Sequence, residues 1–203
     1  MKLLLGTKNR GKIRELLAIL NDNDLPEVEL LTVDDRSFSD VPETGGSFLE
    51  NARLKARAIA EETGLPVLAE DSGLEVEALG GAPGVRSARF AGEGATDEQN
   101  VQKLLASLEG VPEERRGARF VCVAVVRFPG PDGRELVAEG ELRGRIAPEP
   151  RGTHGFGYDP VFIPEGYERT LAELGPKVKN RISHRRRALE AIKKALQGLT
   201  SKA

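Results

Sequence analysis

Three cations close to the start of the chain, two between a pair of glycines and one just after it, form the first group of side chains that could do chemistry. Lys8, Arg10 and Lys12 lie in the sequence GTKNRGK at residues 6–12. A leucine run before them predicts a buried strand, and the apolar spacing after them predicts a helix. A loop between a strand and a helix directs backbone N–H groups at its contents, which suits a phosphate. The alternative is a plain glycine turn whose cations are solvated.

The same residues match a Walker A sequence in every position but the last. Gly11 and Lys12 are followed by Ile13, where a P-loop carries a Ser or Thr hydroxyl that binds Mg²⁺. The sequence therefore predicts a phosphate site of a different kind.

An acidic pair follows a predicted strand at residues 65–69. Asp71 is placed where ligands bind in open α/β sheets, and Mg²⁺ prefers carboxylate and phosphate oxygens. Glu70 would point to the opposite side if the backbone stays extended. Asp71 is therefore a candidate metal ligand. The alternative is a solvated turn acid that caps the glycine after Ser72.

A helix is predicted at residues 47–64, with Ser47 as its N-cap and Gly64 as its stop signal. Glu50 stands three residues after Ser47, where its side chain could complete a capping box. This helix-capping role is the alternative to a role as metal ligand. Asn51 and Lys55 share one face of the helix, where they could hydrogen-bond or face solvent.

Basic residues open the last predicted helix, in the sequence SHRRR at residues 183–187. Cations are unfavourable at a helix N-terminus, which is already positive, and an anionic ligand would remove the conflict. Lys177 and Lys179 would add to the same site. Solvated arginines are the alternative. Neighbouring side chains on a helix diverge, so the adjacent Ser and His are not expected to form a catalytic dyad.

Two aromatic residues occur in the glycine loop GFGYDP at residues 155–160. A flat ligand such as a purine could stack on Phe156, while Asp159 or backbone groups read its edge. The alternative is a loop whose aromatic side chains fold back into the core.

These segments lie in a predicted α/β or α+β domain with a mixed sheet. Its order is strand, helix, strand, helix, strand, then a β-rich stretch and a final helix. Residues 28–33 predict a further strand, residues 96–108 a helix, and residues 118–128 and 135–146 an antiparallel pair.

Composition narrows the class of protein. The 203 residues carry a net charge of −2, with a pI of about 5.9, which gives no global field for holding a nucleic-acid duplex. No stretch approaches 18 apolar residues, so no membrane span is expected and the cytoplasm is the expected location.

Together, the phosphate loop, the acids, the extra cations and the aromatic platform describe a nucleoside triphosphate site. The chain closely resembles the inosine/xanthosine triphosphate pyrophosphatase family over nearly its whole length. The blocks that carry the resemblance are TKNRGK (7–12), SFLENARLKA (47–56), AEDSGL (69–74), LGGAPGVRSARF (79–90), GFGYDPVF (155–162) and KNRISHR (179–185).

The resemblance implies an elongated α/β fold of two lobes around a long mixed sheet, with flanking helices and the active site in the cleft between the lobes. Residues 1–203 would form this single two-lobed domain, and two copies would form a homodimer. Such enzymes hydrolyse ITP, dITP and XTP to the monophosphate and pyrophosphate with Mg²⁺.

The resemblance also implies roles for individual residues. Asp71 would bind the metal and act as general base, Glu50 would be a further metal ligand, and Lys55 would join Asp71 in catalysis while holding the triphosphate. The residues expected to bind substrate are Thr7, Lys8, Asn9, Arg10, Gly11, Lys12, Ser72, Phe156, Gly157, Tyr158, Asp159, Lys179, His184 and Arg185. Among these, Thr7, Asn9, Lys12 and Lys179 would hold the triphosphate, Phe156 would stack on the base, and Tyr158, Asp159, His184 and Arg185 would recognise a 6-oxo purine.

Three other functions compete with this interpretation. A P-loop kinase or NTPase would release orthophosphate and a diphosphate, and Ile13 argues against it. A non-catalytic module would bind ITP without turnover. An RNA or DNA binder that uses residues 185–187 would show salt-sensitive binding to oligonucleotides.

Overall fold

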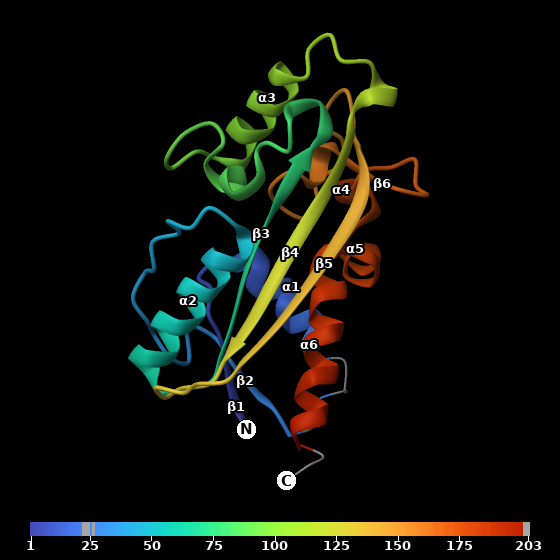
Figure 1. Ribbon diagram of the computed structural model, residues 1–203. Coiled ribbons are helices and arrows are strands. Elements are labelled where there is room, and N and C mark those ends of the chain that lie inside the picture. The colour runs from blue at the N-terminus through green and yellow to red at the C-terminus, as the bar shows by residue number, and fades with distance from the viewer. Residues whose placement is uncertain (22–24, 26, 201–203) are drawn as a thin grey trace. The chain divides into compact units, whose positions relative to one another are not determined.

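The computed structural model describes residues 1–21, 25 and 27–200, and contains a six-stranded mixed sheet flanked by helices (Figure 1). The strands lie in the order β2-β1-β3-β4-β5-β6. The strand bounds are β1 (Lys2–Leu5), β2 (Glu29–Leu31), β3 (Val67–Val76), β4 (Gly117–Arg127), β5 (Glu135–Ile146) and β6 (Phe162–Pro164). The α-helices are α1 (Arg10–Leu20), α2 (Phe48–Thr63), α3 (Asp97–Ser107), α4 (Leu171–Leu174), α5 (Pro176–Ile182) and α6 (His184–Thr200). Short 3₁₀ helices occupy Glu77–Leu79, Gly84–Arg89, Glu113–Arg115 and Asp159–Val161.

The chain divides into two compact units. The first comprises the described parts of Met1–Asp71, Cys122–Gly140 and Arg185–Ala203, and the second comprises Ser72–Val121 and Glu141–His184. Residues 22–24, 26 and 201–203 of the predicted 1–203 domain lie outside the described residues.

The first unit has an apolar layer on each face of its strands. Leu3 and Leu5 of β1 pack with α1 and α6, while the intervening Leu4 packs with α2. This is the period of two that a strand gives to successive side chains. Figure 1 accordingly shows α2 on one side of β1 and β3, with α1 and α6 on the other. β1 runs parallel to both β2 and β3.

The second unit has a core of its own, formed where one face of β3, β4 and β5 meets helix α3 and the segments around β6. Leu74 and Val76 of β3 contribute to it, and Leu104 of α3 is fully buried in it. The β6 strand pairs antiparallel with the end of β5. The mixed α/β sheet is thus confirmed.

The strand that was predicted at residues 65–69 is longer in the structure, where it is β3. It runs without a break from Val67 through Glu70 and Asp71 to Val76, so the two acids stand within the strand and not beyond its end. Gly73 does not stop the strand, and residues 77–79 after it form a 3₁₀ helix. Because the backbone stays extended, Glu70 and Asp71 direct their side chains to opposite faces.

Helix starts are set by side chains within one turn. Asn9 caps α1, which begins at Arg10, so Gly11 and Lys12 lie in the helix and the predicted loop is shorter than residues 6–12. Ser47 and Gly64 cap α2, as predicted, and Thr96 caps α3 with a full capping box. Helices α4 and α5 were not predicted. Within the described part of the chain, no helix combines the length and apolar character that crossing a membrane needs.

Candidate active site

The N-terminal loop has fewer cations available for a ligand than its sequence indicates. Lys8 lies 2.7 Å from Asp40, and Arg10 forms two hydrogen bonds to the carboxylate of Asp34, so each cation faces an acid of its own unit. Asn9 accepts a hydrogen bond from the backbone N–H of Lys12 at 3.1 Å, and Thr7 accepts one from that of Asn9.

Lys12 belongs to a buried cluster of charges centred on Glu70. The Lys12 Nζ lies 3.1 Å from Glu70 Oε1, and Nη2 of Arg185 lies 3.3 Å from the same oxygen. Glu15 of α1 accepts a hydrogen bond from the other terminal nitrogen of Arg185. Burial alone would raise the pKa of Glu70, but the charges of Arg185 and Lys12 outweigh it and hold that pKa well below its usual range. Glu70 is thus a fixed anion that positions two cations.

Asp71 is the acid with the opposite environment. It is 4% exposed, and burial raises its pKa to about 6 despite the nearby ammonium groups of Lys55 and Lys12. The amide of Asn51 donates a hydrogen bond to Asp71 Oδ2 at 3.1 Å. A carboxylate that ionises near neutral pH is suited to accept a proton from water.

Lys55 of α2 contacts both the strand that carries Asp71 and an acid in the loop before the helix. The Lys55 Nζ donates to the Glu70 backbone carbonyl at 2.7 Å and lies 2.8 Å from Glu43 Oε1. The negative charge of Glu43 is in turn one of the charges that raise the pKa of Asp71. Burial would raise the pKa of Glu43, but Lys55 lowers it below its usual value, so Glu43 is ionised.

Glu50 lies elsewhere on α2. Its carboxylate accepts a hydrogen bond from the backbone N–H of Gly46 at 2.7 Å and is exposed to solvent. Ser47 accepts from the Glu50 N–H at 3.1 Å, so only half of the expected capping box is present. The Glu50 carboxylate therefore binds the backbone at the entrance of α2.

The donors around Asp71 fit a divalent cation that also binds phosphate. Among residues 1–21, 25 and 27–200, no group of three His, Cys, Asp or Glu side chains could hold a metal. Mg²⁺ is commonly held by one or two carboxylates together with substrate phosphates and waters. Asp71 and Glu43 supply two carboxylates, and Lys12 and Lys55 supply charge for phosphates.

The second unit contains the predicted base-binding residues other than Arg185. Lys179 of α5 lies 2.6 Å from Asp159 Oδ2, and its Nζ stands 4.5 Å from the centroid of the Phe156 ring. The Asp159 carboxylate also accepts a hydrogen bond from the Phe156 N–H at 3.1 Å. Lys179, which was expected to hold the triphosphate, is thus placed with the aromatic platform.

Further contacts fix the same loop. The Tyr158 hydroxyl donates to the Ser87 carbonyl at 2.7 Å, so one of the two aromatics folds into the core. The Gly157 N–H donates to Asp97 at 2.9 Å. His184 is buried and stacks on Phe120 at 4.8 Å.

The structure therefore groups the predicted residues in two sets. The first unit contains Lys12, Lys55, Asp71 and Arg185. The second unit contains Ser72, which is its first residue, together with Phe156, Gly157, Tyr158, Asp159, Lys179 and His184. Arg185 pairs with Glu15 and Glu70 of the first unit, and these two acids offset its unfavourable charge at a helix N-terminus.

Sequence reasoning missed Glu43, Glu15 and the bridging role of Asn51. Glu43 stands in a polar loop with no periodic pattern, and nothing in its spacing points to Asp71. Glu15 offered one signal, because it lies three residues after Lys12 and so shares a face of α1 with it.

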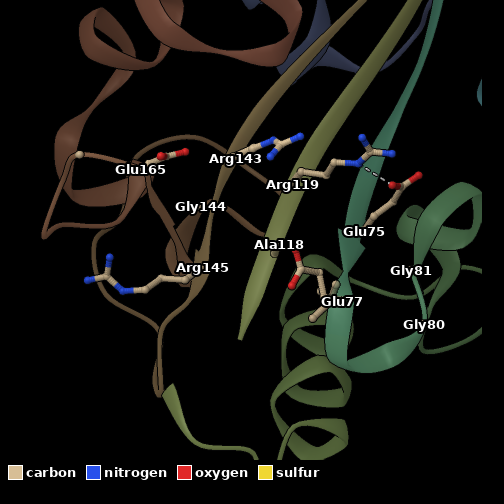
Figure 2. Close-up of a pocket in the computed structure, with 12 residues that line it drawn as sticks. Glu75, Glu77, Gly80, Gly81, Ala118, Arg119, Arg143, Gly144, Arg145 and Glu165 are labelled. Carbon is tan, nitrogen blue, oxygen red and sulfur yellow. Dashed lines mark hydrogen bonds and ion pairs between the residues drawn. The ribbon is translucent and has the colours of Figure 1, made fainter. Parts of the chain in front are cut away.

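A hollow of about 710 Å³ in the second unit is lined by none of the predicted site residues. Its charged lining consists of Glu75, Glu77, Glu165, Arg119, Arg143 and Arg145, and Figure 2 shows the ion pair that joins Arg119 to Glu75. Acids and bases occur in equal number, so the hollow is not built for an anion.

Comparisons with known proteins agree over nearly the whole chain. A sequence model of the Ham1 family matches residues 3–195. The dITP/XTP pyrophosphatase of Streptomyces coelicolor is 51% identical over 192 residues, which cover 94% of each chain. A HAM1 protein from Coxiella burnetii has a TM-score of 0.87 at 43% identity, covering 98% of this chain and 99% of its own. The nucleoside-triphosphatase / dITP/XTP pyrophosphatase of Mycobacterium abscessus has a TM-score of 0.74 at 47% identity, covering 95% and 97%.

Proposed function

The chain belongs to the Ham1 family, and we propose on that basis that it hydrolyses dITP, XTP and ITP to the monophosphate and pyrophosphate. The observation that carries the proposal is the cluster around the buried Asp71, where the Glu43 carboxylate and the ammonium groups of Lys12 and Lys55 lie close enough to shift its pKa. This set meets the needs of a triphosphate, a divalent cation and an attacking water at once.

Lys12, Lys55 and Asp71 have different roles in the proposed reaction. Lys12 and Lys55 bind the triphosphate and stabilise the charge that develops on the leaving pyrophosphate. Asp71 accepts a proton from the water whose oxygen attacks the α-phosphorus, while the bond from that phosphorus to the bridging oxygen breaks. Mg²⁺, when bound, would neutralise phosphate oxygens and orient them.

The carboxylates that hold the metal are Asp71 and Glu43 in this proposal. Glu43 shares the environment of Asp71 and Lys55, whereas Glu50 binds the backbone at the entrance of α2. Glu50, which was first expected to bind the metal, is therefore the alternative ligand. Substituting Glu43 and Glu50 one at a time decides which of the two binds the metal.

The second unit recognises the base. Phe156 stacks on the purine, and Lys179 donates to its O6 from a position fixed by Asp159. Adenine carries an amino group at that position, so a donor would face a donor and ATP would be rejected. Tyr158 and His184 fix the loop and the start of α6, and Ser72 contacts the substrate next to Asp71.

One assay tests this function directly. The purified protein is incubated with Mg²⁺ and dITP, XTP, ITP, GTP or ATP, and the phosphate product is identified. We expect pyrophosphate and a monophosphate from the first three, and much slower turnover of ATP. Release of orthophosphate and a diphosphate would indicate the P-loop alternative, and binding of ITP without turnover would indicate the sensing module; either result contradicts the proposal.

We also propose that two copies associate through the sheet face of the second unit that bears the hollow. On β4 and β5, Ala118 and Leu142 face the core, whereas Arg119 and Arg143 face outward, and the Arg143 side chain is 69% exposed. A two-fold interface brings the same patch of both copies together, so a charged patch is self-complementary only if it holds both signs. The hollow meets that requirement with three arginines and three glutamates.

The remaining proposals concern the chain as a whole. Residues 1–203 act as one pyrophosphatase domain in the cytoplasm, where the nucleotide pool is found. Nucleic acid and membranes are not partners of the protein in this proposal, and its partners are the purine nucleoside triphosphate and a second copy.

A further inference from the structure

Asn51 is a fully buried amide that connects the strand carrying Asp71 with the loop carrying Glu43. Its Nδ2 donates to Asp71 Oδ2 at 3.1 Å, and its Oδ1 accepts from the backbone N–H of Gly45 at 2.8 Å. We propose that Asn51 is a positioning residue that assembles the Asp71 and Glu43 carboxylates into a metal-binding pair before substrate arrives. The inference rests on the proposed function and adds a residue to which that function assigned no role.

The orientation of this amide follows from its two partners. An ionised carboxylate can only accept hydrogen bonds, and a backbone N–H can only donate one. The nitrogen of Asn51 must therefore face Asp71, and its oxygen must face Gly45. No other side chain of this size offers one donor and one acceptor at this spacing, since an aspartate would place a second carboxylate against Asp71.

Lys55 forms a second bridge one helical turn later. Its Nζ binds the Glu70 backbone carbonyl of β3 at 2.7 Å and the Glu43 carboxylate at 2.8 Å. Asn51 and Lys55 thus each connect the same strand with the same loop from one face of α2. Lys55 offsets the negative charge of Glu43, whereas the neutral Asn51 orients the Asp71 carboxylate without changing the net charge of Asp71 and Glu43.

Gly45 shows how closely the loop must approach the helix. A Cβ at this position would lie 2.7 Å from the Cβ of Glu50 and 2.8 Å from the Oδ1 of Asn51. Both distances are shorter than real contacts, so the loop reaches Asn51 only without a side chain at Gly45. The approach places Glu43, two residues earlier, beside Lys55.

The same chain offers a matched control in Asn100, which is 3% exposed near the start of α3. Its Oδ1 accepts from the Ala91 N–H at 2.8 Å, and its Nδ2 donates to the Ala88 carbonyl at 3.0 Å. Asn100 therefore bridges a loop to a helix as Asn51 does, but binds no carboxylate. Replacing either by alanine removes one donor and one acceptor from a buried site.

The test compares Asn51→Ala, Gly45→Ala and Asn100→Ala with the unchanged full chain. Mn²⁺ alone, without nucleotide, is titrated into each protein and free Mn²⁺ is measured by EPR. Thermal unfolding, and the Mg²⁺ concentration that gives half-maximal hydrolysis of dITP, are measured in parallel. Changes to residues that orient metal ligands typically weaken metal affinity about 10- to 100-fold.

We expect Asn51→Ala and Gly45→Ala to weaken Mn²⁺ binding about tenfold and to raise the Mg²⁺ requirement in step. We expect Asn100→Ala to lower the melting temperature as Asn51→Ala does, with Mn²⁺ binding within twofold of the unchanged chain. Gly45→Ala keeps the test decisive if Asn51→Ala does not fold. Equal Mn²⁺ affinity in all four proteins, equal loss in Asn100→Ala, or no Mn²⁺ binding by the unchanged chain overturns the inference. Failure to hydrolyse dITP despite normal Mn²⁺ binding would instead overturn the proposed function.

Discussion

Glu70 and Asp71 are neighbours in one strand, yet the structure gives them opposite electrostatic environments. Glu70 lies against the cations Arg185 and Lys12, which keep it ionised. Asp71 points to the other face, where burial raises its pKa to about 6. Two acids whose pKa values are separated in this way can hold different roles, one as a fixed counter-charge and one as a base.

Replacing Asp71 by asparagine should abolish turnover and stabilise the metal-free protein above pH 6. The folded chain raises the pKa of Asp71 from 3.8 to about 6. Its contribution to stability is therefore fully present below about pH 4 and is lost as the pH rises through about 6. A pKa difference of about two units corresponds to about 3 kcal/mol, so we expect a gain of about 1–3 kcal/mol at pH 8.

Urea unfolding in EDTA at pH 4.5 and pH 8 measures this effect. The gain in the free energy of unfolding should be larger at pH 8. An equal difference at both values would show that burial does not raise the pKa of Asp71, and an active Asp71→Asn protein would contradict its role as base.

Separate substitutions of Glu43 and Glu50 by glutamine distinguish the proposed metal ligand, Glu43, from the alternative, Glu50. We expect Glu43→Gln to reduce kcat by about 100-fold or more and to raise the Mg²⁺ requirement, because it removes a carboxylate beside Asp71. Glu50→Gln should change activity by less than about threefold, since its contact with the Gly46 N–H survives as a neutral hydrogen bond. Kinetics at several Mg²⁺ concentrations check both, and the reverse order would restore the metal role to Glu50.

At the scale of elements, helix α2 is the part that organises the site. Its sequence predicted both ends correctly because Ser47 and Gly64 act on backbone groups within one turn. The same residues could not reveal which face of α2 meets β3 and the loop before the helix. That face became visible only through the partners of Asn51 and Lys55.

A change at the far end of α2 should affect stability and leave the site intact. Gly64 has a φ of 69° with no atom within 4 Å of an added Cβ, so Gly64→Ala meets a backbone penalty without a clash. We expect a loss of about 1 kcal/mol in the free energy of unfolding, with kcat and KM for dITP unchanged. Denaturant unfolding and steady-state kinetics check this, and a changed kcat would mean that the helix end communicates with the site.

At the scale of the whole molecule, each unit has its own core and its own share of the functional residues. The first unit holds the charged cluster around Asp71, and the second holds the platform at Phe156 and the charged hollow. Residues 170 positions apart, Glu15 and Arg185, meet inside the first unit. Such pairs form because the first unit is built from three segments that are far apart in the sequence.

Association of two copies should depend on the charges that line the hollow. Arg143→Glu would leave two arginines and four glutamates in the lining, so like charges would meet across a two-fold interface. We expect the dimer dissociation constant to rise about tenfold or more, and to rise also in 1 M salt, which screens such contacts. Sedimentation at several protein concentrations measures it.

Arg36→Glu, an exposed charge change outside the hollow, is the control for this measurement. It should leave the dissociation constant unchanged. A monomeric unchanged chain, or equal effects of both substitutions, would contradict the proposed surface.

The sequence by itself determined what depends on neighbouring residues. Helix caps, the buried strand β1, and the identity of the phosphate-loop and carboxylate motifs follow from groups a few positions apart, whose interactions any folded chain must make. Those motifs sufficed to indicate a nucleoside triphosphate site, and the family resemblance that they carry pointed to a pyrophosphatase.

Only the tertiary structure decided which charges act together. It placed Glu43 in the environment of Asp71, paired Glu50 with the Gly46 N–H, grouped Arg185 with Glu15 and Glu70, and placed Lys179 beside Phe156. It also fixed the burial that separates the pKa values of Glu70 and Asp71. The physical reason is that electrostatic partners and desolvation depend on distance in space, which sequence spacing does not encode beyond a single helix or strand.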